Sequence, residues 1–139
     1  MTNNRYIGLD VGTKRIGIAV SDPLFILARP VKTIPRYPEN KSIEEIKDVC
    51  KEYNVSVIIV GLPKNMDGSI GPQAQDAMAF AKLLEDNIQT EVVFEDERLS
   101  SYEAERILIE QNKKPSKNKA LIDMEAAAIV LQQYLNRRS

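Results

Sequence analysis

Three acidic positions in this sequence stand where ordinary strand and helix patterns do not require an acid. Asp10 interrupts the apolar run Ile7–Val11, Glu95–Glu97 follow a second apolar run, and Asp123 lies on the apolar face of the last expected helix. Aspartate is depleted in strands, and burying an unpaired carboxylate costs several kcal/mol. Carboxylates from such distant segments can hold two cations about 4 Å apart, which stabilise the attacking and leaving oxygens of a phosphodiester.

Each of these acids also has a purely structural explanation. Asp10 could end its strand and accept backbone hydrogen bonds in the turn at Gly12-Thr13. The acids at 95–97 could form a solvated turn before a helix, and Asp123 could be a first-turn residue favoured by the helix dipole. Spacing along the chain does not by itself show that the three converge.

The absence of histidine narrows the possible chemistry. With no histidine and one cysteine, the chain can build neither a Ser-His-Asp or Cys-His nucleophile system nor a zinc site of histidines or thiolates. The single cysteine, Cys50, cannot form an internal disulfide. Carboxylates with a hard divalent cation, Mg²⁺ or Mn²⁺, are therefore the natural option for an enzyme of this composition.

The elements that must position these acids follow from the hydrophobic pattern. Two strands separated by a short turn form a hairpin, and Pro30 directs the third strand to a sheet edge or a bulge. Ser42 with Glu45, and Ser100 with Glu103, have the spacing of capping boxes that begin helices. The expected strands are Arg5–Val11, Arg15–Val20, a segment within Leu27–Ile34, Val55–Val60 and Thr90–Glu95; the expected helices begin at Ser42, Pro72, Ser100 and Lys119, the last three ending near Glu85, Gln111 and Asn136, with Gly61–Gly71 as a loop.

This order, β-β-β-α-β-α-β-α-α, predicts an α/β fold with a mixed sheet and helices packed on it. We expect one domain over residues 1–139, because no repeat, linker or low-complexity tract divides the chain. No apolar run approaches the roughly 20 residues of a membrane span. The N-terminus has no signal-peptide pattern, and we expect a cytoplasmic protein without membrane contact.

Four sequence segments resemble the YqgF family, whose members are described as Holliday-junction-resolvase-like proteins and pre-16S ribosomal RNA nucleases of the ribonuclease H-like superfamily. The segments are Gly8–Gly17, Val60–Ser69, Asp96–Ser100, and Asp123 with Ala126–Gln132. The resemblance covers nearly the whole chain. It implies a ribonuclease H-like fold with a five-stranded mixed sheet flanked by helices.

The resemblance also implies a metal-dependent endonuclease that uses Asp10, Glu97 and Asp123 as catalytic and metal-binding acids. The second acid has local rivals in Glu95 and Asp96, because related resolvases carry theirs at the end of the fourth strand, where this chain has Gly61-Leu62-Pro63. The implied substrate is pre-ribosomal RNA or branched DNA, in the first case with ribosomal particles as partners. The implied protein is a monomer or a homodimer.

Basic residues near these acids are candidate nucleic-acid contacts, although the net charge of −1 gives no global attraction to nucleic acid. Ordinary solvated surface explains each of them equally well. The candidates are Lys14, Arg15, Arg98, Lys117 and Lys119.

Two other classes of function remain open from the sequence. The segment Asp10–Thr13 followed by Ile16–Val20 looks like the first phosphate-binding segment of actin-like ATPases and sugar kinases, although 139 residues leave room for only one such lobe. A non-catalytic RNA-binding factor of ribosome assembly would also keep the fold and the basic contacts. RNA and DNA differ in 2′-hydroxyl contacts that the sequence does not reveal.

Overall fold

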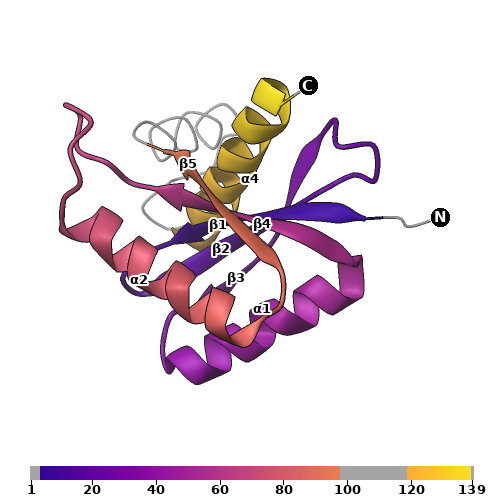
Figure 1. Ribbon diagram of the computed structural model, residues 1–139, viewed down its shortest axis with the longest axis horizontal. Helices are drawn as coiled ribbons and strands as arrows, with labels where there is room; N and C mark the ends of the chain where they lie inside the picture. The colour runs from indigo at the N-terminus through magenta and orange to yellow at the C-terminus, as the bar shows by residue number, and fades with distance from the viewer. Residues whose placement is uncertain (1–3, 98–118, 139) are drawn as a thin grey trace.

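The fold is built on one mixed five-stranded sheet (Figure 1). The computed structural model describes residues 4–97 and 119–138. The strands are β1 (Arg5–Val11), β2 (Arg15–Ser21), β3 (Ala28–Pro35), β4 (Val55–Leu62) and β5 (Glu91–Asp96), and the helices α1 (Glu39–Tyr53), α2 (Pro72–Asn87) and α4 (Lys119–Arg138).

The strand order is β3-β2-β1-β4-β5, with the first three strands antiparallel and with β4 and β5 added in parallel. This arrangement confirms the expected mixed sheet. It also places Pro30 where expected, because β3 is an edge strand and its register against β2 shifts between Ile18 and Ala19, opposite Lys32 and Pro30. A proline lacks the N–H that a central strand would need, so it is tolerated at such an edge.

The helices cover the two faces of the sheet unequally. Helices α1 and α2 pack on one face in a large core that includes Leu9, Val11 and Phe80. Of the helices in residues 4–97 and 119–138, α4 is the one that packs on the other face, against a smaller cluster that includes Ile59 and Leu131. Figure 1 shows it on the side of the sheet away from α1 and α2. Alternation along β1 therefore directs Asp10, which lies between Leu9 and Val11, toward the α4 face.

Several element boundaries differ from the sequence-based expectation. Helix α1 begins at Glu39 with Pro38 as its N-cap, so the expected cap at Ser42 is wrong. Ser42 lies inside the first turn, where its hydroxyl donates to the Glu39 carbonyl at 2.9 Å. The ring of Pro38 fixes its φ at −69°, close to the helical value, so the chain enters the helix directly after it, at Glu39 and before Ser42. Strand β4 continues through Gly61 and Leu62, which were expected to begin a loop.

The expected helix from Ser100 to Gln111 lies outside the described residues. The remaining elements follow the predicted order. Among the described residues, no helix is long and apolar enough to cross a membrane.

Candidate active site

Asp10 lies near the carboxyl end of β1, at the centre of the sheet, where β1 pairs with β2 on one side and β4 on the other. Its Cα partner on β2 is Gly17. The carboxyl ends of parallel strands are where ligand sites form in α/β proteins. The second predicted acid, Glu97, directly follows β5 at the same end of the sheet, because β4 and β5 run parallel to β1.

Glu97 and Asp10 are neighbours in the folded chain. Glu97 is only 9% exposed, and its backbone N–H donates to the Leu62 carbonyl at 3.2 Å. A Cβ built on Gly61 would lie 2.4 Å from Oε2 of Glu97, so the glutamate side chain crosses the position that a residue of β4 would otherwise fill. The structure thus brings the first two predicted acids together at the ends of β1 and β5.

The environment disfavours negative charge on both carboxyl groups. Burial raises the pKa of Asp10 from 3.8 to about 6; a hydrogen bond with Glu97 acts against this shift, while the nearby Asp123 charge adds to it. Burial likewise raises the pKa of Glu97 well above its ordinary value, and the adjacent Asp10 charge raises it further. Two enclosed carboxyl groups of like charge favour either a shared proton or a bound cation.

Asp123 lies in the first turns of α4, on the helix face that packs on the sheet, as its spacing from buried Ala127 predicted. Its carboxylate accepts a hydrogen bond from Nε of Arg15 at 2.7 Å. A Cβ on Gly17 would fall 2.0 Å from the Asp123 carbonyl oxygen. Glycine at 17 therefore allows the helix backbone to approach β2 closely enough to place Asp123 beside the Asp10 strand.

The three acids do not form a closed triad in this arrangement. Over residues 4–97 and 119–138, no three acidic side chains are grouped closely enough to hold one ion. Asp10 and Glu97 form a pair, while Asp123 faces Arg15. Even so, the pair has the chemistry of a cation site: its donors are all carboxylate oxygens, and the buried Oε2 of Glu97 has no hydrogen-bond partner among the described residues.

A cavity of about 140 Å³ opens at this pair. It is lined by Asp10, Val11, Thr13, Pro63, Gln73, Asp76 and Glu97. Gln73 and Asp76 come from the first turns of α2, a helix that the sequence did not connect with the site. Asp76 fits an ordinary polar helix surface in the sequence, so no sequence signal singled it out.

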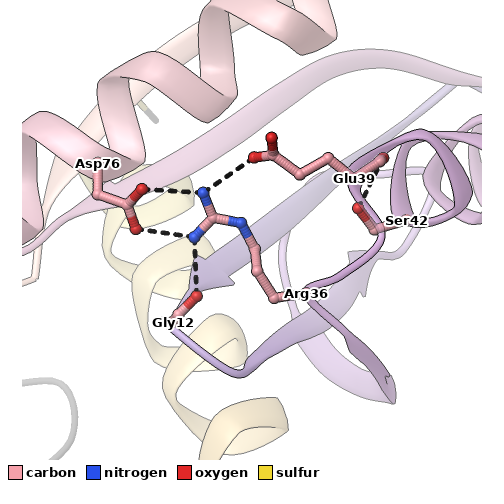
Figure 2. Close-up of polar contacts among 5 residues, drawn as sticks. All are labelled: Gly12, Arg36, Glu39, Ser42 and Asp76. Carbon is pink, nitrogen blue, oxygen red and sulfur yellow. Dashed lines mark hydrogen bonds and ion pairs between the residues drawn. The ribbon is translucent and has the colours of Figure 1, made fainter.

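Arg36, which follows β3, was also missed. It is 1% exposed, and its guanidinium donates to both carboxylate oxygens of Asp76 at 2.8 and 2.9 Å. The same group donates to the Gly12 carbonyl at 2.9 Å and to Glu39 at 3.2 Å, as Figure 2 shows. The Arg36 contacts hold the pKa of Asp76 below its ordinary value. A basic residue after an edge strand usually lies in solvent, so its burial could not be predicted from sequence.

The other predicted residues have different surroundings. Glu95, a rival for the second acid, forms an ion pair with Arg137 of α4. Lys14 and Lys119 are exposed, as a phosphate contact requires. Arg98 and Lys117 lie outside the described residues. Burial raises the pKa of the Cys50 thiol to about 11, so that cysteine is protonated at neutral pH and is not poised as a nucleophile.

Comparison with solved structures places the fold. RuvC of T. thermophilus in complex with a Holliday junction substrate superposes with a TM-score of 0.60 at 14% identity, covering 96% of this chain and 94% of that one. The fowlpox virus Holliday junction resolvase gives a TM-score of 0.59 at 16% identity, covering 97% of this chain and 99% of that one. The fold is thus ribonuclease H-like, as the family resemblance implied.

Curated relatives are similar over nearly their whole length. A protein of Clostridioides difficile is 48% identical over 136 residues, covering 98% of this chain and 96% of its own, and one of Clostridium beijerinckii is 46% identical over 132 residues, covering 95% and 96%. Both are named "Putative pre-16S rRNA nuclease". The family model RuvX, described as Holliday junction resolvase, matches residues 4–137. The chain therefore belongs to the RuvX family, also called YqgF.

Proposed function

We propose that this chain is a metal-dependent endonuclease that hydrolyses phosphodiesters of structured nucleic acid. The observation that carries the proposal is the enclosed pair of Asp10 and Glu97, in which both carboxyl groups have raised pKa values and Oε2 of Glu97 lacks a partner. A largely enclosed pair of acids with an unpartnered carboxylate oxygen is costly for a fold to keep. Such departures from folding rules tend to fall at functional sites.

Asp10 and Glu97 would hold the divalent cation, Mg²⁺ or Mn²⁺, because hard cations of this kind take carboxylate oxygens. When bound, the ion would supply Lewis-acid stabilisation of the charge that develops as the phosphodiester is cleaved. Positive charge at this position would also favour the ionised form of both carboxyl groups, and so oppose the rise in pKa that burial causes.

Asp123 would complete the set of acids in the presence of substrate. Its carboxylate is engaged by Arg15, whose side chain is 36% exposed and thus within reach of an approaching phosphate. Arginine binds phosphate at least as readily as carboxylate. A substrate phosphate that binds Arg15 in place of Asp123 would free Asp123 to move toward Asp10. Exposed Lys14 in the adjoining turn would bind the next phosphates of the nucleic-acid backbone.

The substrate we favour is the 5′ end of pre-16S ribosomal RNA, with branched DNA as the alternative. The relatives' names support the first, and the family description and the likeness to RuvC support the second. RNA processing would bring the chain to ribosomal particles in the cytoplasm, where a monomer suffices. Symmetric cutting of a junction would require a two-fold dimer.

The decisive experiment compares Asp10→Asn with Asp86→Asn. Asp86 pairs with Lys82 on the exposed surface of α2, so it provides the same chemical change away from the cavity. Both purified proteins are incubated, with Mg²⁺ or Mn²⁺, with an RNA spanning the 5′ end of 16S and with a four-way DNA junction. We expect Asp86→Asn to cleave like the wild type on the true substrate and Asp10→Asn to lose at least about 100-fold in rate.

Wild-type cleavage rates from a folded Asp10→Asn protein would refute the carboxylate mechanism. Cellular complementation then separates an enzyme from a non-catalytic assembly factor. Full rescue of a deletion strain by Asp10→Asn would favour the assembly factor, whereas rescue by Asp86→Asn alone supports the nuclease.

A further inference from the structure

Arg36 is a buried cation that connects separate walls of the carboxylate cavity. It follows β3, and Figure 2 shows its guanidinium placed between Asp76 of α2, Glu39 of α1 and the Gly12 carbonyl. Neither Arg36 nor Asp76 belongs to the set of acids and basic contacts that make up the proposed nuclease site. Asp76 nevertheless lines the cavity, and Arg36 binds both of its carboxylate oxygens.

On one side, Arg36 donates hydrogen bonds to the turn that joins β1 to β2. Its side chain donates to the Gly12 carbonyl at 2.9 Å, and its backbone N–H donates to the Lys14 carbonyl, also at 2.9 Å. One residue thereby engages the carbonyls on both sides of Thr13, which lines the cavity. The same turn directly continues the strand that carries Asp10, so its position sets where that strand ends.

On the other side, Arg36 binds helix α2. Its guanidinium donates hydrogen bonds to both carboxylate oxygens of Asp76, at 2.8 and 2.9 Å. Asp76 lines the cavity together with Gln73, one turn earlier on α2. The guanidinium also lies near the ring of Phe80, 4.9 Å from its centroid, which restricts the plane of the fork. The β1–β2 turn and α2 are therefore fixed relative to each other through one planar group.

Stability alone is a poor explanation for this arrangement. A buried ion pair can often be replaced by apolar side chains of similar volume without loss, because desolvation offsets the attraction. Here the desolvation is not fully offset, since the buried Nε of Arg36 lacks a partner in the described part of the chain. What a guanidinium provides and an apolar residue does not is a two-pronged, directional contact that fixes orientation.

We propose that Arg36 is a positioning residue of the carboxylate site. It acts through the Gly12 carbonyl and the Asp76 carboxylate, and it holds the β1–β2 turn against α2 so that Asp10 meets Glu97 in the geometry that a divalent cation requires. Its fork also occupies both oxygens of Asp76 and thereby keeps this additional acid from competing for the cation. The proposal rests on the proposed nuclease function, because it assigns Arg36 to that same site.

The test compares Arg36→Met and Arg36→Lys with Ile46→Val, a truncation in the core beneath α1 that serves as the control for lost stability. Methionine keeps the length of the stem without any donor, and lysine keeps the charge but cannot reach all four oxygens at once. Mn²⁺ affinity is measured by electron paramagnetic resonance. Exchange of the Gly12 amide, which donates to the Arg15 carbonyl at 2.8 Å within the β1–β2 turn, is measured by NMR. The values of kcat and KM are measured on the substrate that the wild type cleaves.

For Arg36→Met we expect Mn²⁺ affinity to fall by about 10- to 100-fold, the range found when groups that orient metal ligands are removed. We also expect faster exchange at the Gly12 amide than in Ile46→Val, and a loss in kcat with KM within about twofold of the wild type. Arg36→Lys should show the same pattern to a smaller degree. If Arg36→Met does not fold, Arg36→Lys decides the question by the same measurements.

A folded Arg36 variant with wild-type Mn²⁺ affinity and wild-type exchange at the Gly12 amide would overturn the proposal. Equal losses in Ile46→Val and Arg36→Met would overturn it as well, because they would reduce Arg36 to a contribution to stability. Failure of the proposed function is distinguishable from both results. In that case the wild type itself would neither bind Mn²⁺ at the pair nor cleave, and the role of Arg36 would fall with it.

Discussion

The side chain of Glu97 occupies the space that Gly61 leaves empty on the neighbouring strand. A Cβ at position 61 would lie 2.4 Å from Oε2 and 2.7 Å from Cδ of Glu97, closer than such atoms approach in real proteins. Glu97 thus comes from the end of β5, and Gly61 near the end of β4 leaves room for its side chain. Glycine at 61 is a requirement of the site rather than of the strand, which would accept alanine.

Gly61→Ala should therefore impair the site more than the fold. The added methyl group must displace the Glu97 carboxylate, so we expect Mn²⁺ affinity and cleavage rate to fall by at least about tenfold. Gly71→Ala is the matched control, because its Cβ would meet only Asn65 side-chain atoms, at 3.0 Å and beyond. Titration with Mn²⁺ checks both variants; equal affinity in the two would contradict the placement of Glu97.

Asp10→Asn should stabilise the metal-free protein at high pH. The pKa of Asp10 is raised from 3.8 to about 6, so the folded state holds this proton more tightly than the unfolded state does. That contribution to stability is fully present below about pH 3.8 and is lost as the pH rises through about 6. The loss at pH 8 is about 3 kcal/mol, and the neutral asparagine avoids it.

Thermal unfolding in EDTA at pH 4 and pH 8 measures this effect. The variant should unfold at a higher temperature than the wild type at pH 8, with little difference at pH 4. Asp86→Asn, exposed on α2, should show no such pH dependence. A destabilised Asp10→Asn protein at pH 8 would mean that Asp10 serves the fold through its charge.

Divalent metal should reverse this pH dependence in the wild type. A cation binds the deprotonated carboxylates, so binding competes with protons and strengthens as the pH rises through about 6. At a Mn²⁺ concentration about 100 times the Kd, we expect a stabilisation of about 2.7 kcal/mol at pH 8 and much less at pH 5. EDTA should remove the shift, and an equal shift in Asp10→Asn would place the ion elsewhere.

Lys14 and Arg15 adjoin in sequence but should differ in function. Lys14 is exposed, so Lys14→Gln should weaken nucleic-acid binding evenly across sequences and lower the salt slope by about 1. Arg15 holds Asp123 at 2.7 Å and would exchange it for a substrate phosphate, so Arg15→Gln should lower kcat as well as affinity. Binding isotherms at several salt concentrations, beside single-turnover rates, distinguish the two; Lys82→Gln on α2 is the surface control.

Most of the architecture could be predicted from local sequence patterns. The switch from period-2 to helical spacing predicted the strand and helix order, and the continuous apolar run at Val55–Val60 predicted a strand buried on both faces, which is β4. Asp10 also stood out in the sequence, because an acid inside an apolar strand conflicts with the local pattern. These features are local, so the chain order reveals them directly.

The contacts between distant side chains depend instead on how the whole chain packs. Glu97 faces Asp10 because β5 lies beside β4 and Gly61 leaves room, while Glu95 of the same acidic run pairs with Arg137. Arg36 and Asp76 come together from segments 40 residues apart, and nothing local marks either one. Contacts of this kind depend on strand order and on the approach of helices to the sheet, which hydrophobic periodicity does not encode.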